Sequence, residues 1–181
     1  AVVNWLPKPG DAVNCDAQAP FAALAFKVAS DDHGAMVFVR VYSGRLRRGD
    51  AVLNATTGRM ERASRLYEVH ADDRIERDEL AAGDIAAIVG LKDTLTGHTL
   101  CDREHPVQLE QISVPEPVIH VAIEAKARND QQALAKALHA MLREDPSLQL
   151  RQDAESGQTI LSGMGELQLD VSIEKLRAKY G

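Results

Sequence analysis

The chain has 181 residues, of which 45% are hydrophobic and 27% charged, and its formal net charge is −6. This composition disfavours disorder, no apolar run reaches the roughly 20 residues that cross a bilayer, and two cysteines cannot form a disulfide scaffold. The negative charge argues weakly against a general nucleic-acid binder. We expect one large or two small folded domains in a reducing cytoplasm.

Before about residue 115, apolar residues recur with the period of two that is typical of strands. Short strands separated by turn residues, without an amphipathic helix, predict an antiparallel β-barrel or sandwich. We predict a buried strand with nearly continuous apolar character at Met36–Tyr42, followed by a turn at Ser43-Gly44. Further strands are predicted at Phe21–Ala29, Arg45–Arg48, Ala51–Asn54, Met60–Val69 and Asp84–Val89.

Charge is distributed unevenly over this part of the chain. From Arg40 to Arg65 there are seven arginines and two acids, whereas from Glu68 to Asp84 there are seven acids and two arginines. A basic strand face beside an acidic loop could contact RNA phosphate. The same pattern also suits an ordinary solvated surface on which opposite charges lie near one another, and charge alone favours that interpretation.

A stiff connector is predicted at Val114-Pro115-Glu116-Pro117, because two prolines one residue apart favour an extended backbone without ladder hydrogen bonds. We therefore divide the chain into a barrel at residues 1–103, a linker at 104–117 and a second domain at 118–181.

The second domain follows the order strand, helix, strand, strand, helix. Asn129 and Asp130 offer an N-cap for the first helix, and Pro146 ends it. The second helix is predicted from about Glu166. This order makes five sixths of a split βαβ, or ferredoxin-like, unit that lacks its last strand, so we expect a fragment of a longer chain.

Catalytic motifs are missing from the sequence. There is no G-x-x-x-x-G-K-[ST] motif, so we expect no phosphate-binding loop of this kind and no enzyme activity from this segment. His98, Cys101 and His105 offer only three possible metal ligands in turn-rich sequence, so no metal site is expected. Both cysteines of the chain, Cys15 and Cys101, fall in segments predicted as loops. Gly163-Met164-Gly165 is interpreted as a tight turn that lets a helix approach a sheet closely.

Taken together, several motifs in this order and spacing resemble bacterial elongation factor G over essentially the whole chain. They are Val2–Pro7, Arg40–Gly44, Gly90–Thr94, Ser113–Val118, Glu144–Pro146 and Ser162–Leu167. The resemblance implies that residues 1–103 are a translation-factor β-barrel and that the following domain is the ferredoxin-like third domain of that family.

The family promotes ribosomal translocation of tRNA and mRNA with a GTPase domain, which would bind GTP and Mg and is absent from this chain. The resemblance implies a segment without a cofactor of its own. Its expected partners are the ribosome, through small-subunit RNA and protein, and the GTPase domain of the parent chain, whose state it relays. The resemblance also makes Arg45, Arg47 and Arg48 candidates for ribosomal RNA contact.

In this family the antibiotic fusidic acid binds at the junction between the third domain and the GTPase domain. The matching positions here are Asp145, Gly163, Met164, Leu167 and Gln168. Gln168 stands where the family usually has His, and His98 stands where it usually has Asp. The turn at Asp31–Gly34 also lacks the proline and aromatic residue common in the family. Loss of the imidazole at Gln168 puts fusidic acid sensitivity in question, and the three departures together suggest a diverged paralogue.

Two alternatives stay open at this point. One is a ribosomal-protection or release-type translational GTPase, which shares the superfamily. The other is an unrelated nucleic-acid-binding β-barrel, a class that typically displays aromatic stacking platforms; the seven aromatic residues of this chain leave few for that purpose.

Overall fold

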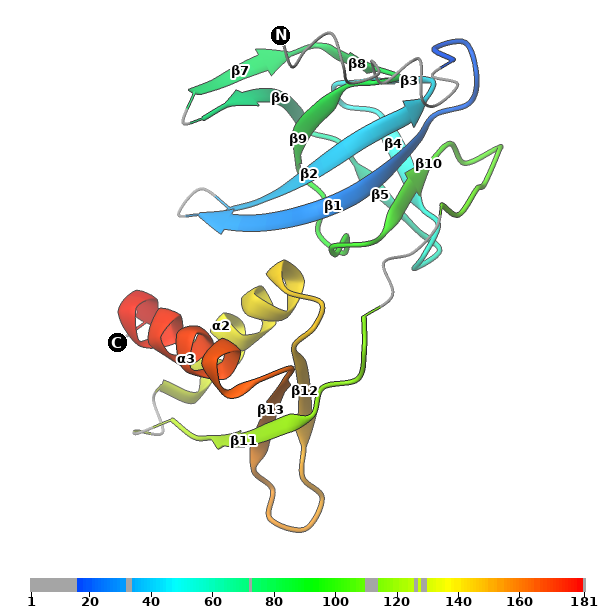
Figure 1. Ribbon diagram of the computed structural model, residues 1–181. Coiled ribbons are helices and arrows are strands. Elements are labelled where there is room, and N and C mark those ends of the chain that lie inside the picture. Colours follow the sequence, from blue (N-terminus) through cyan, green and yellow to red (C-terminus); the bar gives the residue numbers. More distant parts are fainter. Residues whose placement is uncertain are drawn as a thin grey trace, which may run out of the picture. The chain divides into compact units, whose positions relative to one another are not determined.

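The computed structural model describes residues 16–31, 34–71, 73–109, 114–125, 127 and 130–180. The chain divides into two compact units, Ala1–Gln111 and Ile112–Gly181, each of which is described by itself (Figure 1). This division falls inside the predicted linker 104–117. Of the features named above, the Val2–Pro7 motif, Cys15, Ser113 and Asn129 lie outside the described residues.

The first unit is an antiparallel β-barrel, as predicted. Eight of its strands form one sheet in the order β5-β4-β10-β1-β2-β9-β6-β7, and β3 pairs with β8. The strands are β1 Ala22–Asp31, β2 Gly34–Ser43, β3 Arg45–Arg47, β4 Ala51–Asn54, β5 Arg59–Arg62, β6 Arg65–His70, β7 Asp73–Arg77, β8 Glu79–Ala81, β9 Ile85–Val89 and β10 Thr99–Cys101.

Strand β2 corrects the prediction of a continuously buried segment. Val37, Val39 and Val41 are fully buried in the barrel core, whereas the residues between them are half-buried on the outward face. A barrel strand packs only one face against the core, so large apolar side chains on the other face made the sequence look buried throughout.

The predicted strand Met60–Val69 is instead two strands, β5 and β6. The chain changes its partner strand between them. The Ala63 N–H donates to the Asp50 carbonyl, whereas the Ser64 N–H donates to the Val89 carbonyl, both at 2.9 Å. Strand β5 pairs with β4, while β6 pairs with β7 and β9. No glycine or proline marks the change of partner at Ala63-Ser64, which is why the sequence did not reveal the break.

Two segments predicted as loops are also strands. The acidic segment forms β7 and β8, and every residue of β7 is exposed, so that it carries no apolar alternation. Cys101 lies in β10, whose three residues are all buried, and its thiol is free. A strand of three residues is too short to show a period.

The turn at Ser43-Gly44 is present as predicted and requires glycine. Gly44 has φ +72°, and a Cβ atom there would lie 2.6 Å from Cα of Phe21. Backbone atoms cannot yield as a flexible side chain does, so this turn fixes where β3 leaves β2.

The second unit has the predicted order of elements: β11 Ile119–Ile123, α2 Gln131–Glu144, β12 Gln149–Gln152, β13 Thr159–Gly163 and α3 Glu166–Tyr180. Its antiparallel sheet has the order β11-β13-β12, the arrangement expected of a split βαβ unit. Leu138 of α2, Leu161 of β13 and Leu169 of α3 are buried together in its core. No helix in the described part of the chain is long and apolar enough to span a membrane.

The ends of α2 differ in how well they follow the sequence. Asp130 occupies the N-cap position but makes no side-chain capping hydrogen bond, because its backbone is helical (φ −89°, ψ −8°) rather than extended. At the other end the chain leaves the helix at Asp145, before Pro146, as predicted.

Candidate functional site

The five residues predicted at the interdomain surface lie close together at one end of the second unit. Gly163 ends β13, Met164 lies in the turn, Leu167 and Gln168 are in the first turn of α3, and Asp145 directly follows α2. The glycine turn therefore brings the start of α3 to the end of α2.

Gln168 connects these segments through its side-chain amide. The amide oxygen accepts a hydrogen bond from the Met164 N–H at 2.7 Å. The amide nitrogen donates to the Asp145 carboxylate at 2.9 Å and to the Ser147 hydroxyl at 2.6 Å. We call Asp145, Ser147, Met164 and Gln168 the Gln168 junction.

Gly163 makes room for this arrangement. A Cβ atom at Gly163 would lie 2.9 Å from Oε1 of Gln168 and 2.9 Å from Cδ2 of Leu169, whereas one at Gly165 would meet no atom within 4 Å. The close helix–sheet approach predicted from the two glycines thus depends on Gly163.

Asp145 is the charged group of the Gln168 junction. Its partial burial opposes ionisation, but hydrogen bonds from the Ser147 hydroxyl, the Ser147 N–H and Gln168, together with the charge of Lys175, hold the pKa of Asp145 below its ordinary value. The carboxylate is therefore ionised at neutral pH. Sequence reasoning missed Ser147, although an aspartate two residues before a serine at a helix end is the signal of a local side-chain turn.

Beside the Gln168 junction, large apolar side chains face solvent. Leu167 is 77% exposed, and Met164 and Val171 are 38% and 42% exposed. Their spacing of three and four residues places them on one side of α3 and the turn before it. Exposed apolar side chains gathered in this way indicate a contact surface.

The three predicted RNA-contact arginines lie on and just after β3, and all of them form ion pairs. Nη1 of Arg45 and Nε of Arg47 lie 2.5 and 3.0 Å from the carboxylate of Glu79. Arg48 lies 2.8 Å from Glu76 and 3.7 Å from Asp78.

These pairs favour the second interpretation of the charge pattern, in which opposite charges simply lie near each other. The carboxylates of β7 and β8 cancel much of the positive field of the arginines. The side chains nevertheless stay in water, with Arg47 74% exposed. Exposed ion pairs of this kind contribute little to stability.

A buried polar network, not foreseen from the sequence, holds the loop before β10. Glu61 is only 8% exposed. One of its oxygens accepts from the Asn54 amide at 3.2 Å and the Thr94 hydroxyl at 2.5 Å, and the other from the N–H groups of Lys92 and Asp93 at 2.5 and 2.8 Å. Four donors satisfy the buried carboxylate, which fastens the loop to β4 and β5.

His98 belongs to this network. Its Nδ1 lies 3.2 Å from both the Asn54 amide nitrogen and the Leu95 N–H. Burial lowers the pKa of His98, while the charge of Glu61 acts in the opposite direction. Cys101 is buried in β10, and His105 lies 3.8 Å from Asp102. Over the described ranges, no three His, Cys, Asp or Glu side chains are grouped to hold a metal ion.

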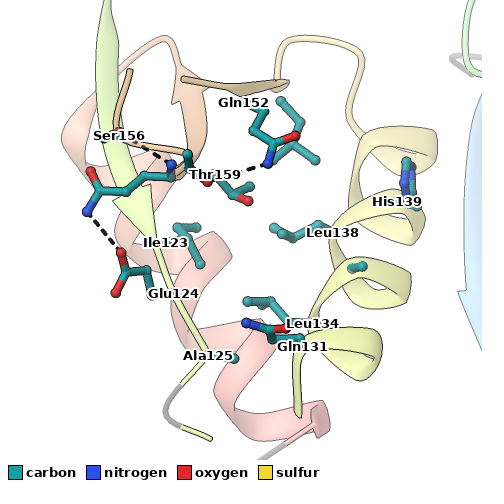
Figure 2. A pocket seen from close by; sticks show the side chains of 14 residues that line it. Ile123, Glu124, Ala125, Gln131, Leu134, Leu138, His139, Gln152, Ser156 and Thr159 are labelled. Carbon is teal, nitrogen blue, oxygen red and sulfur yellow. Dashed lines mark hydrogen bonds between the residues drawn. The ribbon is translucent and has the colours of Figure 1, made fainter. Parts of the chain in front are cut away.

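The second unit also contains a cavity of about 560 Å³ between α2 and its sheet (Figure 2). Ile123, Leu134 and Leu138 contribute apolar side chains to its lining. At its rim Gln158 donates a hydrogen bond to Glu124 at 2.9 Å. None of the predicted site residues lines this cavity.

Family profiles match the two units separately. Residues 34–101 match the family described as elongation factor Tu domain 2, and residues 114–181 match elongation factor G, domain III. Curated relatives match the chain as a whole: elongation factor G 2 of Shewanella denitrificans is 46% identical over 197 aligned residues that include the whole chain. The chain is related to elongation factor G along its entire length.

A second curated relative and a solved structure are similar to nearly the whole chain. Elongation factor G 2 of Hahella chejuensis is 48% identical over 99% of the chain. A solved structure from Thermus thermophilus is 32% identical with a TM-score of 0.80, covering 97% of this chain and 26% of that one. The chain spans 28% of the length of the two curated relatives.

Proposed function

We propose that the chain is the non-catalytic second and third domains of a cytoplasmic translational GTPase that promotes ribosomal translocation of tRNA and mRNA. The observation that carries this proposal is the 46% identity to elongation factor G 2 over the whole chain. In the complete protein, GTP and Mg would be bound by the GTPase domain, and residues 1–103 and 118–181 would act through surfaces.

The Gln168 junction and the exposed side of α3 are proposed to meet the GTPase domain and relay its nucleotide state. Asp145, Gly163, Met164, Leu167 and Gln168 would form the surface that matches the fusidic acid junction of the family. Supporting this role, a rigid hydrogen-bonded junction lies beside an exposed apolar side of one helix. Gln168 lacks the titratable ring usual at this position, so we expect altered fusidic acid sensitivity.

Arg45, Arg47 and Arg48 are proposed to contact small-subunit ribosomal RNA, with Arg47 reaching phosphate first. Its side chain is the most exposed of the three, and it shares Glu79 with Arg45. Phosphate would then compete with Glu79, so that these contacts are weak and salt-dependent.

The test is a chimera in which the chain replaces the matching segment of the Shewanella denitrificans relative, with that relative unchanged as the control. We expect the chimera to sustain repeated rounds of peptide synthesis on ribosomes. A chimera that hydrolyses GTP but instead splits ribosomes, or only displaces a ribosome-bound antibiotic, would replace this proposal by the release-type or protection-type alternative.

A further inference from the structure

The outward face of the barrel sheet collects aromatic and cationic side chains from β1, β2 and β6. Four of the six phenylalanine and tyrosine residues of the chain lie there. We call this surface the aromatic face and define it by Phe26, Lys27, Phe38, Arg40, Tyr42, Arg65 and Tyr67.

Strand register places the rings side by side. Phe38 pairs with Ala87 of β9, and Ala87 pairs with Tyr67 of β6, so the two residues lie on the same face with their backbones two strands, or about 10 Å, apart. Tyr42 follows Phe38 on the same face of β2, about 13 Å along the strand. Ala87 is fully covered although its side chain is on the outward face, which means that larger neighbours close over it.

Cations lie over the Phe38 and Tyr42 rings, and a third cation contacts the hydroxyl group of Tyr67. Nζ of Lys27 lies 5.6 Å from the centre of the Phe38 ring, and Cζ of Arg40 lies 5.4 Å from the centre of the Tyr42 ring. Nη1 of Arg65 donates to the Tyr67 hydroxyl at 3.1 Å. Phe26 adds a tilted ring with its centre 6.4 Å from that of Phe38.

These cations differ from Arg45, Arg47 and Arg48 because they are not neutralised. Among the described residues, no ion pair joins Lys27, Arg40 or Arg65 to a carboxylate. Nε of Arg40 is buried and has no hydrogen-bond partner there. The face therefore keeps its positive charge, although the buried Nε of Arg40 itself is not accessible to a ligand.

We propose that the aromatic face binds single-stranded RNA, with unpaired bases stacking on Phe38, Tyr42 and Tyr67 and phosphates held by Lys27, Arg40 and Arg65. Flat rings interleaved with cations suit bases joined by phosphates, because every base has a stacking face. A protein partner would favour contiguous apolar surface, which the cations interrupt. The choice of RNA as the partner rests on the proposed function. The aromatic face is nevertheless a different surface from β3, which carries Arg45 and Arg47.

The test titrates the 181-residue chain into a labelled oligo-uridine and measures the fluorescence anisotropy of the label. The oligo-uridine is about ten nucleotides long, which is within the site size of small RNA-binding barrels. An abasic oligonucleotide of the same length supplies the phosphates without the bases. We expect the RNA to bind more tightly than the abasic strand. We expect Phe38→Ala and Tyr42→Ala each to weaken RNA binding by about five-fold or more.

Further variants separate stacking from folding and from charge. Phe38→Leu keeps apolar bulk but removes the flat ring, and it should weaken RNA binding as Phe38→Ala does. Ile75→Ala removes an exposed apolar side chain from the other face of the sheet and should leave affinity unchanged. Lys27→Gln should lower the slope of log affinity against log salt by about 0.7, whereas Arg151→Gln in the second unit should not.

Equal affinity for the RNA and the abasic strand, or unchanged RNA affinity in Phe38→Leu, would overturn the proposal. The proposal would also be overturned if this face bound a small-subunit ribosomal protein and did not bind RNA. A chimera that fails in peptide synthesis while the chain still binds RNA through its aromatic rings would count against the proposed function alone.

Discussion

Gly163 and Gln168 share one small space between β13 and α3. Replacing Gly163 by alanine places a methyl group 2.9 Å from side-chain atoms of Gln168 and Leu169. We expect Gly163→Ala to lower the free energy of unfolding by about 1–3 kcal/mol, because the helix must move away from the sheet.

Gly165→Ala is the matched control for this substitution. That position has open space and a φ outside the left-handed region, so alanine there should be neutral or stabilising. Urea unfolding followed by the helical circular dichroism signal reports the second unit, where α2 and α3 lie. Equal stabilities of the two variants would contradict the close approach at Gly163.

Gln168 is predicted to stabilise the same region through its amide. Gln168→Ala leaves the Met164 N–H and the partly buried Asp145 carboxylate without this partner, and we expect a loss of about 1–3 kcal/mol in the same unfolding assay. Gln158→Ala, which removes one exposed hydrogen bond, should change the free energy by less than about 0.5 kcal/mol. A loss no larger than that of the control would show that the junction is not held by Gln168.

His98 is predicted to make the barrel sensitive to acid. Its Nδ1 faces two donors, and burial keeps its pKa below the ordinary value of 6.5 in the folded state. His98 therefore binds a proton more tightly in the unfolded chain than in the folded one. Its contribution to the free energy of unfolding is fully present above about pH 6.5 and is lost as the pH falls below that value.

The check compares wild type with His98→Asn, whose amide oxygen can accept from Leu95 without titrating, in urea unfolding at about pH 7.5 and about pH 5.5. We expect wild type to lose more stability than the variant on acidification. A parallel loss in both proteins would remove His98 from the cause.

At the scale of elements, the sequence predicted the barrel and the order of the second unit because alternation and helical stripes extend over many residues there. It did not reveal β7 and β10, since one is wholly exposed and the other wholly buried. The long-range partners were also hidden: no local pattern shows that Glu79 pairs with Arg45, or that Glu61 accepts from the loop before β10. Gln168 was found only by resemblance, and Ser147 was missed.

The pairing of β3 with β8 leads to a prediction about charge. Glu79→Gln removes the carboxylate shared by Arg45 and Arg47, whose hydrogen bonds keep the pKa of Glu79 low. We expect little change in the free energy of unfolding, because the pairs are exposed to solvent. Affinity for the labelled RNA at low salt should rise more than in Glu174→Gln, which makes the same charge change in the second unit. An equal rise in both variants would show only a general effect of net charge.

At the scale of the whole molecule, no sequence motif of the chain cradles a nucleotide phosphate, and its two units offer surfaces for contact. Under the proposed function, the chain has a mechanical and recognitive role, and a GTPase domain of the complete protein supplies nucleotide hydrolysis. The proposed division of labour separates two observable events, GTP hydrolysis and movement of the mRNA.

The most direct measurement is a single-turnover time course of both events with the chimera that carries this chain. The account predicts that GTP is hydrolysed at the rate of the unchanged relative and that a label on the 3′ side of the mRNA then moves by one codon. Hydrolysis at that rate without any movement of the mRNA would contradict it.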